Sequence, residues 1–156
     1  MHAKVSTIDS PAAMAHVLAM IMATHSELEL SEIRMLESLD AFRSIGISEA
    51  EFLRVADHYR GGPCQSLSRH VWLSLGDAEV IGEILDKVHD TRKRLLLCRL
   101  ASCIIMADGH VEEIEHQIYE RMLLRWGYTR SSVAQAILAE RVHRTRERRA
   151  ERIGAY

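Results

Sequence analysis

Apolar positions along the chain recur at helical spacing, and no stretch of useful length alternates as a β-strand does. Two stretches, 12–23 and 95–107, are apolar nearly all round, which is typical of helices buried at the centre of a protein. Each is shorter than the roughly 20 residues that cross a bilayer, so we expect no transmembrane segment. The pattern predicts an all-α protein of about seven to eight helices.

Capping residues and glycines indicate where these helices begin and end. Pro11 suits the first turn of a helix, where a missing N–H costs nothing. Gly76 and Asp77 are expected to separate two helices. The expected N-terminal caps are Asp9 or Ser10, Ser48, Asp77 and Asp90. The expected helices cover about 11–24, 30–42, 49–60, 66 or 68 to 75, 78–89, 91–107, 113–126 and 130–153.

The order of helices indicates an internal repeat. The segments 20–23 and 104–107 both end a strongly apolar helix, and each is followed by an acidic loop, a helix, a glycine turn and another helix. The alignment places Leu28 opposite Val111, Glu32 opposite Glu115, and Gly46 opposite Gly127. We therefore expect one domain built as a pseudo-twofold bundle of two three-helix repeats. Repeat one covers about 10–60, connector helices 64–90, and repeat two about 91–153.

The composition says more about the partners and cellular setting of the protein than about its fold. The formal net charge of −2 argues against nucleic acid as a partner of the whole protein. The cysteines Cys64, Cys98 and Cys103 form no CxxC pair, which favours buried free thiols in a reducing, cytoplasmic setting. The spacing of six methionines predicts that they face the core: Met14, Met20, Met22, Met35, Met106 and Met122.

Residues 101–115 read ASCIIMADGHVEEIE and resemble the signature of the TerB-like (tellurite-resistance TerB) superfamily. That signature is an apolar helix, Ala-Asp-Gly, an apolar residue two after the glycine and a glutamate seven after the aspartate. The first repeat has Thr24-His25 in place of Asp108-Gly109 but keeps Glu32. The resemblance implies an all-α domain of about seven helices with internal pseudo-symmetry. It also implies a role in tellurite and chemical-stress responses, metal binding through acidic loop residues, and protein partners in a membrane-associated complex.

Asp108, Glu115 and Glu32 are the candidate ligands of a divalent metal cation. Hard cations prefer carboxylate oxygens, and Glu32 joins the other two if the repeats face each other. A structural interpretation stays open, and the residues alone favour it. Asp-Gly is typical of turns, and a glutamate three residues into a helix can bind its free N–H groups. His110 and His116 flank the motif and are expected to be exposed.

Nothing in the sequence resembles known catalytic machinery. It has no phosphate loop, nucleophile elbow, HExxH or dinucleotide fingerprint, and Cys64 is the one plausible reactive thiol. We expect a non-catalytic module that binds a divalent metal. The alternative is a purely structural interaction domain, such as a homodimer, without metal.

The last predicted helix ends in a basic segment. Residues 140–152 hold six arginines against three glutamates, and one helical face carries Arg141, Arg144, Arg148 and Arg152. A solvated helix end is the simplest interpretation, because cations complement the helix dipole there. RNA, an anionic lipid or an acidic protein are alternatives. No aromatic residue is interleaved for base stacking, which argues against single-stranded nucleic acid.

Overall fold

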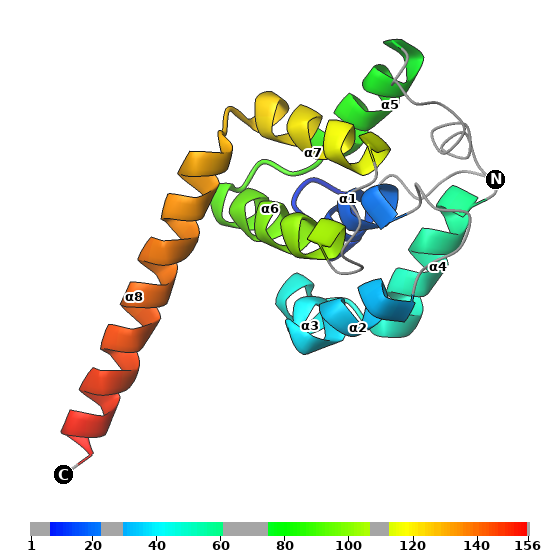
Figure 1. The fold of residues 1–156 in the computed structure, drawn as a ribbon. Helices are drawn as coiled ribbons and strands as arrows, with labels where there is room; N and C mark the ends of the chain where they lie inside the picture. The colour runs from blue at the N-terminus through cyan, green and yellow to red at the C-terminus, as the bar shows by residue number, and fades with distance from the viewer. Residues whose placement is uncertain (1–6, 23–29, 61–74, 107–112, 156) are drawn as a thin grey trace.

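A computed structural model describes residues 7–22, 30–60, 75–106 and 113–155 of the chain (Figure 1). These residues form helices and connections without a strand, which confirms the all-α prediction. The helices are α1 (Pro11–Met22), α2 (Leu30–Ser38), α3 (Ala41–Ile45), α4 (Glu49–Arg60), α5 (Leu75–Leu85), α6 (Thr91–Met106), α7 (Glu113–Trp126) and α8 (Arg130–Gly154).

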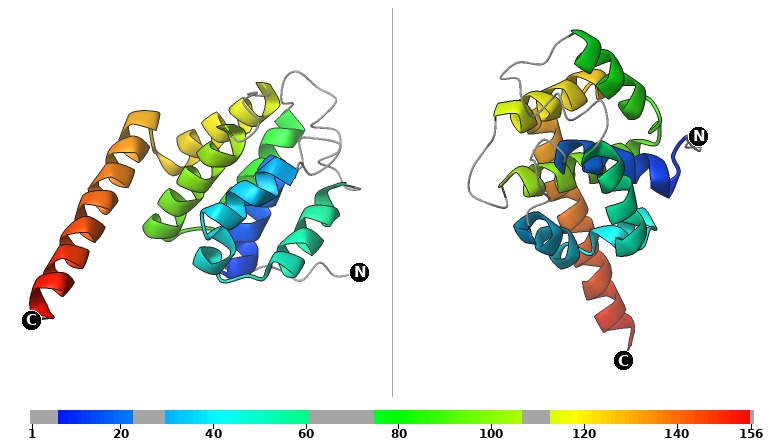
Figure 2. Two further views of the ribbon diagram at one scale, coloured as in Figure 1. Left: turned by 60° about the horizontal axis from the view of Figure 1, so that its bottom comes forward. Right: turned by 90° about the vertical axis from the view of Figure 1, so that its right-hand side faces the viewer.

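The two strongly apolar helices lie against each other at the centre of the structure (Figure 2). Helix α1 buries nine of its 12 residues, because it contacts α3, α4, α5, α6 and α7. Helix α6 buries residues from Leu97 to Ile105 and contacts α1, α2, α7 and α8. The prediction of two central helices is therefore confirmed, and burial of their apolar surface is the main force that assembles the others around them.

The contacts between helices follow a crossed pattern. Helix α1 packs against α4, and α6 packs against α8, so each central helix contacts the last helix of its own half. Helix α2 contacts α6, and α7 contacts α1, so each half also touches the central helix of the other. A duplicated unit would produce this pattern, although the internal repeat itself stays a prediction.

Side-chain caps explain where four of the described helices begin. In four cases the backbone N–H of the third helical residue donates to the side chain of the residue before the helix. These hydrogen bonds are Ala13 N to Ser10 Oγ (3.1 Å), Glu51 N to Ser48 Oγ (3.2 Å), Lys93 N to Asp90 Oδ1 (3.0 Å) and Ser132 N to Thr129 Oγ1 (3.0 Å). The predicted caps Ser10, Ser48 and Asp90 are therefore confirmed.

The prediction of a single helix over 30–42 is wrong. Helix α2 ends at Ser38, and α3 begins at Ala41 after Asp40 adopts a left-handed conformation with φ of 55°. Aspartate tolerates this conformation better than most residues. The turn redirects the chain so that Ala41 and Ile45 both reach the core, and this gain in burial outweighs the continuation of α2.

The expected break at Gly76 and Asp77 is also wrong, because α5 begins at Leu75 and includes both residues. A glycine in a helix costs only about 1 kcal/mol, which packing of the helix against α1 and α7 offsets. Helix α5 ends at Leu85, not near residue 89. The part of the short helix expected over 66–74 lies outside the described residues.

Met106 does not lie in the core, contrary to the prediction. Its side chain is 65% exposed, whereas Met14, Met20, Met22 and Met122 are buried and Met35 is partly buried. Met106 follows the buried Ile104 by two residues, which places it about 200° around α6, on the opposite side. Apolar character did not decide its position, because the core covers only one side of this helix end.

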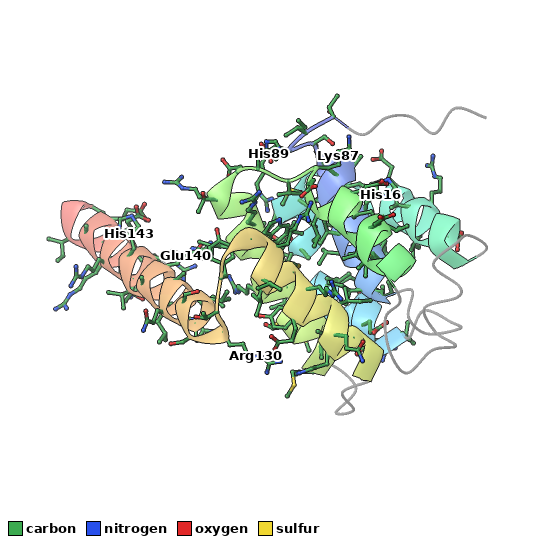
Figure 3. The ribbon with its side chains drawn as sticks, turned by 90° about the horizontal axis from the view of Figure 1, so that it is seen from above. His16, Lys87, His89, Arg130, Glu140 and His143 are labelled. Carbon is green, nitrogen blue, oxygen red and sulfur yellow. The ribbon has the colours of Figure 1, made fainter. Side chains whose placement is uncertain are left out.

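Asp9 links the start of α1 to the connection between α5 and α6. Its carboxylate Oδ1 accepts the backbone N–H groups of His89 (2.6 Å) and Asp90 (2.9 Å), and its own N–H donates to the carbonyl of Lys87 (2.8 Å). Lys93 Nζ donates to the Asp9 carbonyl at 2.6 Å. The labelled Lys87 and His89 lie beside the segment that leads into α1 (Figure 3). The N–H groups of Asp90 and His89 hold the pKa of Asp9 below its ordinary value.

Replacing Asp9 with alanine is expected to lower the melting temperature at neutral pH. Because the folded-state pKa of Asp9 is lowered, its stabilising effect is full above the ordinary carboxyl pKa of about 4 and is lost as the pH falls through the folded value. The difference between Asp9→Ala and wild type should therefore shrink in acid. Melting curves of both proteins at neutral and acidic pH measure this difference in melting temperature, and the exposed change Glu83→Ala serves as the control. A difference that does not change with pH would contradict this role.

Candidate functional site

Glu32 and Glu115 are the charged residues that the described part of the chain buries, and each is 1% exposed. They are the pair that the repeat alignment places opposite each other. Each is the third residue of its helix, Glu32 in α2 and Glu115 in α7. Both helices pack against α6, so the two glutamates enter the same bundle from two sides.

Burial of two carboxylates needs compensation. An ionised carboxylate taken out of water costs several kcal/mol unless hydrogen bonds, a cation or a metal compensate for it. Both glutamates take part in further polar or electrostatic interactions. Their position in the first helical turn also places them near free N–H groups and the positive end of the helix dipole. The site can therefore hold negative charge and attract a positive one.

Asp108, the third predicted ligand, lies outside the described residues, as does His110. Within the described ranges, no group of three or more histidine, cysteine, aspartate or glutamate side chains is arranged to hold a metal ion. The two buried glutamates are thus the part of the predicted ligand set that the structure places. Two carboxylates suit a hard cation such as Mg²⁺, Ca²⁺ or Mn²⁺, whose other positions water can fill.

His116 is half-buried and belongs to a cluster that joins α7 to the start of α8. Arg130 Nε donates to Glu120 Oε1 at 2.7 Å, and Arg130 Nη2 donates to His116 Nδ1 at 3.0 Å. The same guanidinium lies over the ring of Tyr119, 5.8 Å from its centre. Burial raises the pKa of Tyr119 to about 12, so its hydroxyl stays protonated. The side chain of His116 is 40% exposed, in line with the expectation, although Arg130 (labelled in Figure 3) contacts its ring.

A second cluster fixes the other end of α7 to α5. Arg125 Nε donates to Asp86 Oδ1 at 2.9 Å, and this hydrogen bond lowers the pKa of Asp86. The indole N–H of Trp126 donates to the carbonyl of Leu85 at 3.3 Å, and Arg94 lies over the indole. Both ends of α7 are thus anchored, which holds Glu115 in place. Sequence reasoning missed both clusters, because their partners lie up to 41 residues apart.

Cys98, one of the free thiols that the structure describes, is poorly suited to catalysis. Cys98 is buried, as predicted, and burial raises its pKa to about 12, so it stays a protonated, weak nucleophile at neutral pH. Cys103 is partly buried and also free. Cys64, the candidate reactive thiol, lies outside the described residues.

Helix α8 extends away from the other helices for most of its length (Figures 1 and 2). Val133 is its buried residue and Ile137 packs partly against the core, whereas residues 138–155 are all exposed. The prediction of a solvated basic helix end is confirmed as far as exposure is concerned. None of the helices in the described ranges has both the length and the apolar character needed to cross a membrane.

The TerB-like resemblance of residues 101–115 has no independent support. No known family model, no curated protein and no solved structure matches this chain.

Proposed function

We propose that this protein is a non-catalytic, TerB-like helical module that binds a divalent cation through Glu32 and Glu115. The observation that carries the proposal is the burial of both glutamates, each 1% exposed and each the third residue of its helix. The link to tellurite and chemical stress, and to partners in a membrane-associated complex, rests on the resemblance of residues 101–115 alone.

Helix capping by itself does not explain this burial. A glutamate in the first turn of a helix can bind free N–H groups while it stays at the surface, as charged side chains do in most proteins. Here Glu32 and Glu115 bring two carboxylates into a core that is otherwise built of apolar side chains. A bound cation would add to the interactions that each carboxylate already makes and would stabilise both charges together.

A cation held by both glutamates would connect the two halves of the bundle. Glu32 belongs to α2 and Glu115 to α7, and both helices pack on α6. The all-oxygen donor set favours Mg²⁺, Ca²⁺ or Mn²⁺ over Zn²⁺, which prefers nitrogen and sulfur ligands. The role proposed for the metal is therefore to tie α2, α6 and α7 together, and Asp108 is the candidate third ligand.

Cation binding is expected to raise the melting temperature of the full chain. A ligand at 100 times its Kd stabilises the folded state by about 2.7 kcal/mol, which is a shift of about 5–10 °C for a chain of this size. Melting curves with a chelator and with excess Mg²⁺, Ca²⁺, Mn²⁺ or Zn²⁺ measure the effect. Equal melting temperatures under all these conditions would refute the metal site.

A further inference from the structure

Helix α8 is much longer than its packing requires. It spans 25 residues, yet Val133 in its first turn is its buried residue, and every residue from 138 to 155 is exposed. Figure 2 shows this part extending away from the bundle in both views. Most of the stability of helices in proteins comes from packing of one face against other elements, and the exposed part of α8 has no such packing within the described chain. The exposed part of α8 is therefore a candidate contact surface.

The charges of the exposed part are sorted by side. Glu140, Glu147 and Glu151 follow Val133 by seven, 14 and 18 residues, so they lie on the side of α8 that meets the bundle. Arg144 pairs with Glu140, and the imidazole of His143 lies 3.0 Å from Glu147. Because all three glutamates lie on this side, the opposite side of the exposed part of α8 carries no acidic group.

The opposite side, which we name the outer face of α8, combines arginines with aliphatic side chains. This face extends about 60° around the helix axis in each direction from Leu138, and it includes Arg141, Val142, Arg149, Arg152 and Ile153. Leu138 is 59% exposed, and Val142 and Ile153 are also exposed. Because this face is turned away from the bundle, a broad flat surface can reach its whole length.

We propose that the outer face of α8 binds the surface of an anionic lipid bilayer. The guanidinium groups of Arg141, Arg149 and Arg152 would contact lipid phosphates. Leu138 and Val142 would enter the boundary between headgroups and acyl chains, as the apolar side of an interfacial helix does. The glutamates would then face the water. Charge complementarity and the outward orientation carry this assignment, which does not depend on the cation site.

Other occupants fit the outer face less well. Two copies of the chain that paired through it would bring arginines against arginines, which is unfavourable. Nucleic acid would leave Leu138 and Val142 without a favourable contact, and the face has no aromatic side chain for base stacking. Thr145 and Arg149 separate Val142 from Ile153, so insertion into the bilayer would be shallow and binding mainly electrostatic.

The test is cosedimentation of the full chain with vesicles. We expect binding to phosphatidylcholine vesicles that contain about 30% phosphatidylglycerol, weaker binding at high salt, and none to pure phosphatidylcholine. The double variant Arg149→Gln/Arg152→Gln should bind about 30-fold more weakly, since each arginine near such a surface contributes about fivefold. Leu138→Gln should also weaken binding, by less.

The matched control removes two exposed arginines from other helices. Arg34→Gln in α2 with Arg54→Gln in α4 causes the same change in net charge and should leave binding within about twofold of wild type. Circular dichroism checks that both double variants keep their helices. Equal binding by the two double variants, binding to pure phosphatidylcholine, or no binding to anionic vesicles would overturn the proposal. The proposal would also be overturned if the chain bound no vesicles but self-associated or bound duplex RNA, and if Arg149→Gln/Arg152→Gln abolished that interaction.

Discussion

Replacing Glu115 with glutamine is expected to abolish the cation-dependent rise in melting temperature, a loss of about 5–10 °C at saturating metal. Glutamine keeps the size of the side chain and one oxygen but removes the charge that a hard cation requires. The measurement is the difference between melting temperatures with metal and with chelator. Glu79→Gln, an exposed change on α5, is the control and should keep the full difference.

The same variant separates a metal ligand from a helix cap. If Glu115 only bound N–H groups at the start of α7, Glu115→Gln would change the melting temperature equally with metal and with chelator. Without metal, the melting temperature of Glu115→Gln relative to wild type measures what the other interactions of the carboxylate contribute. Glu32→Gln should behave in the same way if both glutamates bind one ion. Asp108→Asn tests the third candidate ligand.

Replacing Leu18 with alanine is expected to destabilise the protein by about 2–5 kcal/mol. Leu18 lies in α1 and is fully buried at the centre of the bundle, so the change removes apolar contacts and leaves a cavity. The matched control is Leu138→Ala in the exposed part of α8, which should change stability by about 0.5 kcal/mol or less. Both changes replace a helical leucine with alanine, so helix propensity contributes equally. Urea unfolding monitored by circular dichroism measures both.

The comparison of the two leucines also bears on α8. A large effect of Leu138→Ala would mean that its side chain packs against something in solution, either the bundle or a second copy. Such a result would contradict a free outer face. A small effect of Leu18→Ala would contradict the central position of α1, which both its apolar pattern and its nine buried residues indicate.

Much of the helical framework could be predicted because it depends on neighbours in the sequence. The caps at Ser10, Ser48 and Asp90 act on N–H groups three residues away, so sequence spacing is enough to find them. The apolar character of α1 and α6 likewise shows in the residues themselves. Helix-length errors arose where tertiary packing overrode local preference, at Asp40 and at the start of α5.

The candidate site was only partly predictable. Sequence alignment of the halves selected Glu32 and Glu115, but the residues alone favoured a structural role for these positions over a metal site. The link from Asp9 to residues 89 and 90 and the contact of Arg130 with His116 were not foreseen, since hydrophobic periodicity says nothing about which polar groups meet.

The sequence by itself determined that this protein is all-α, where most helices begin, and which two helices are apolar enough for its centre. These properties follow from interactions between residues three or four positions apart and from hydrophobicity. Only the tertiary structure decided that Glu32 and Glu115 are buried and that the outer face of α8 is exposed. Burial and orientation depend on the helices that pack around a residue, and those helices come from distant parts of the chain.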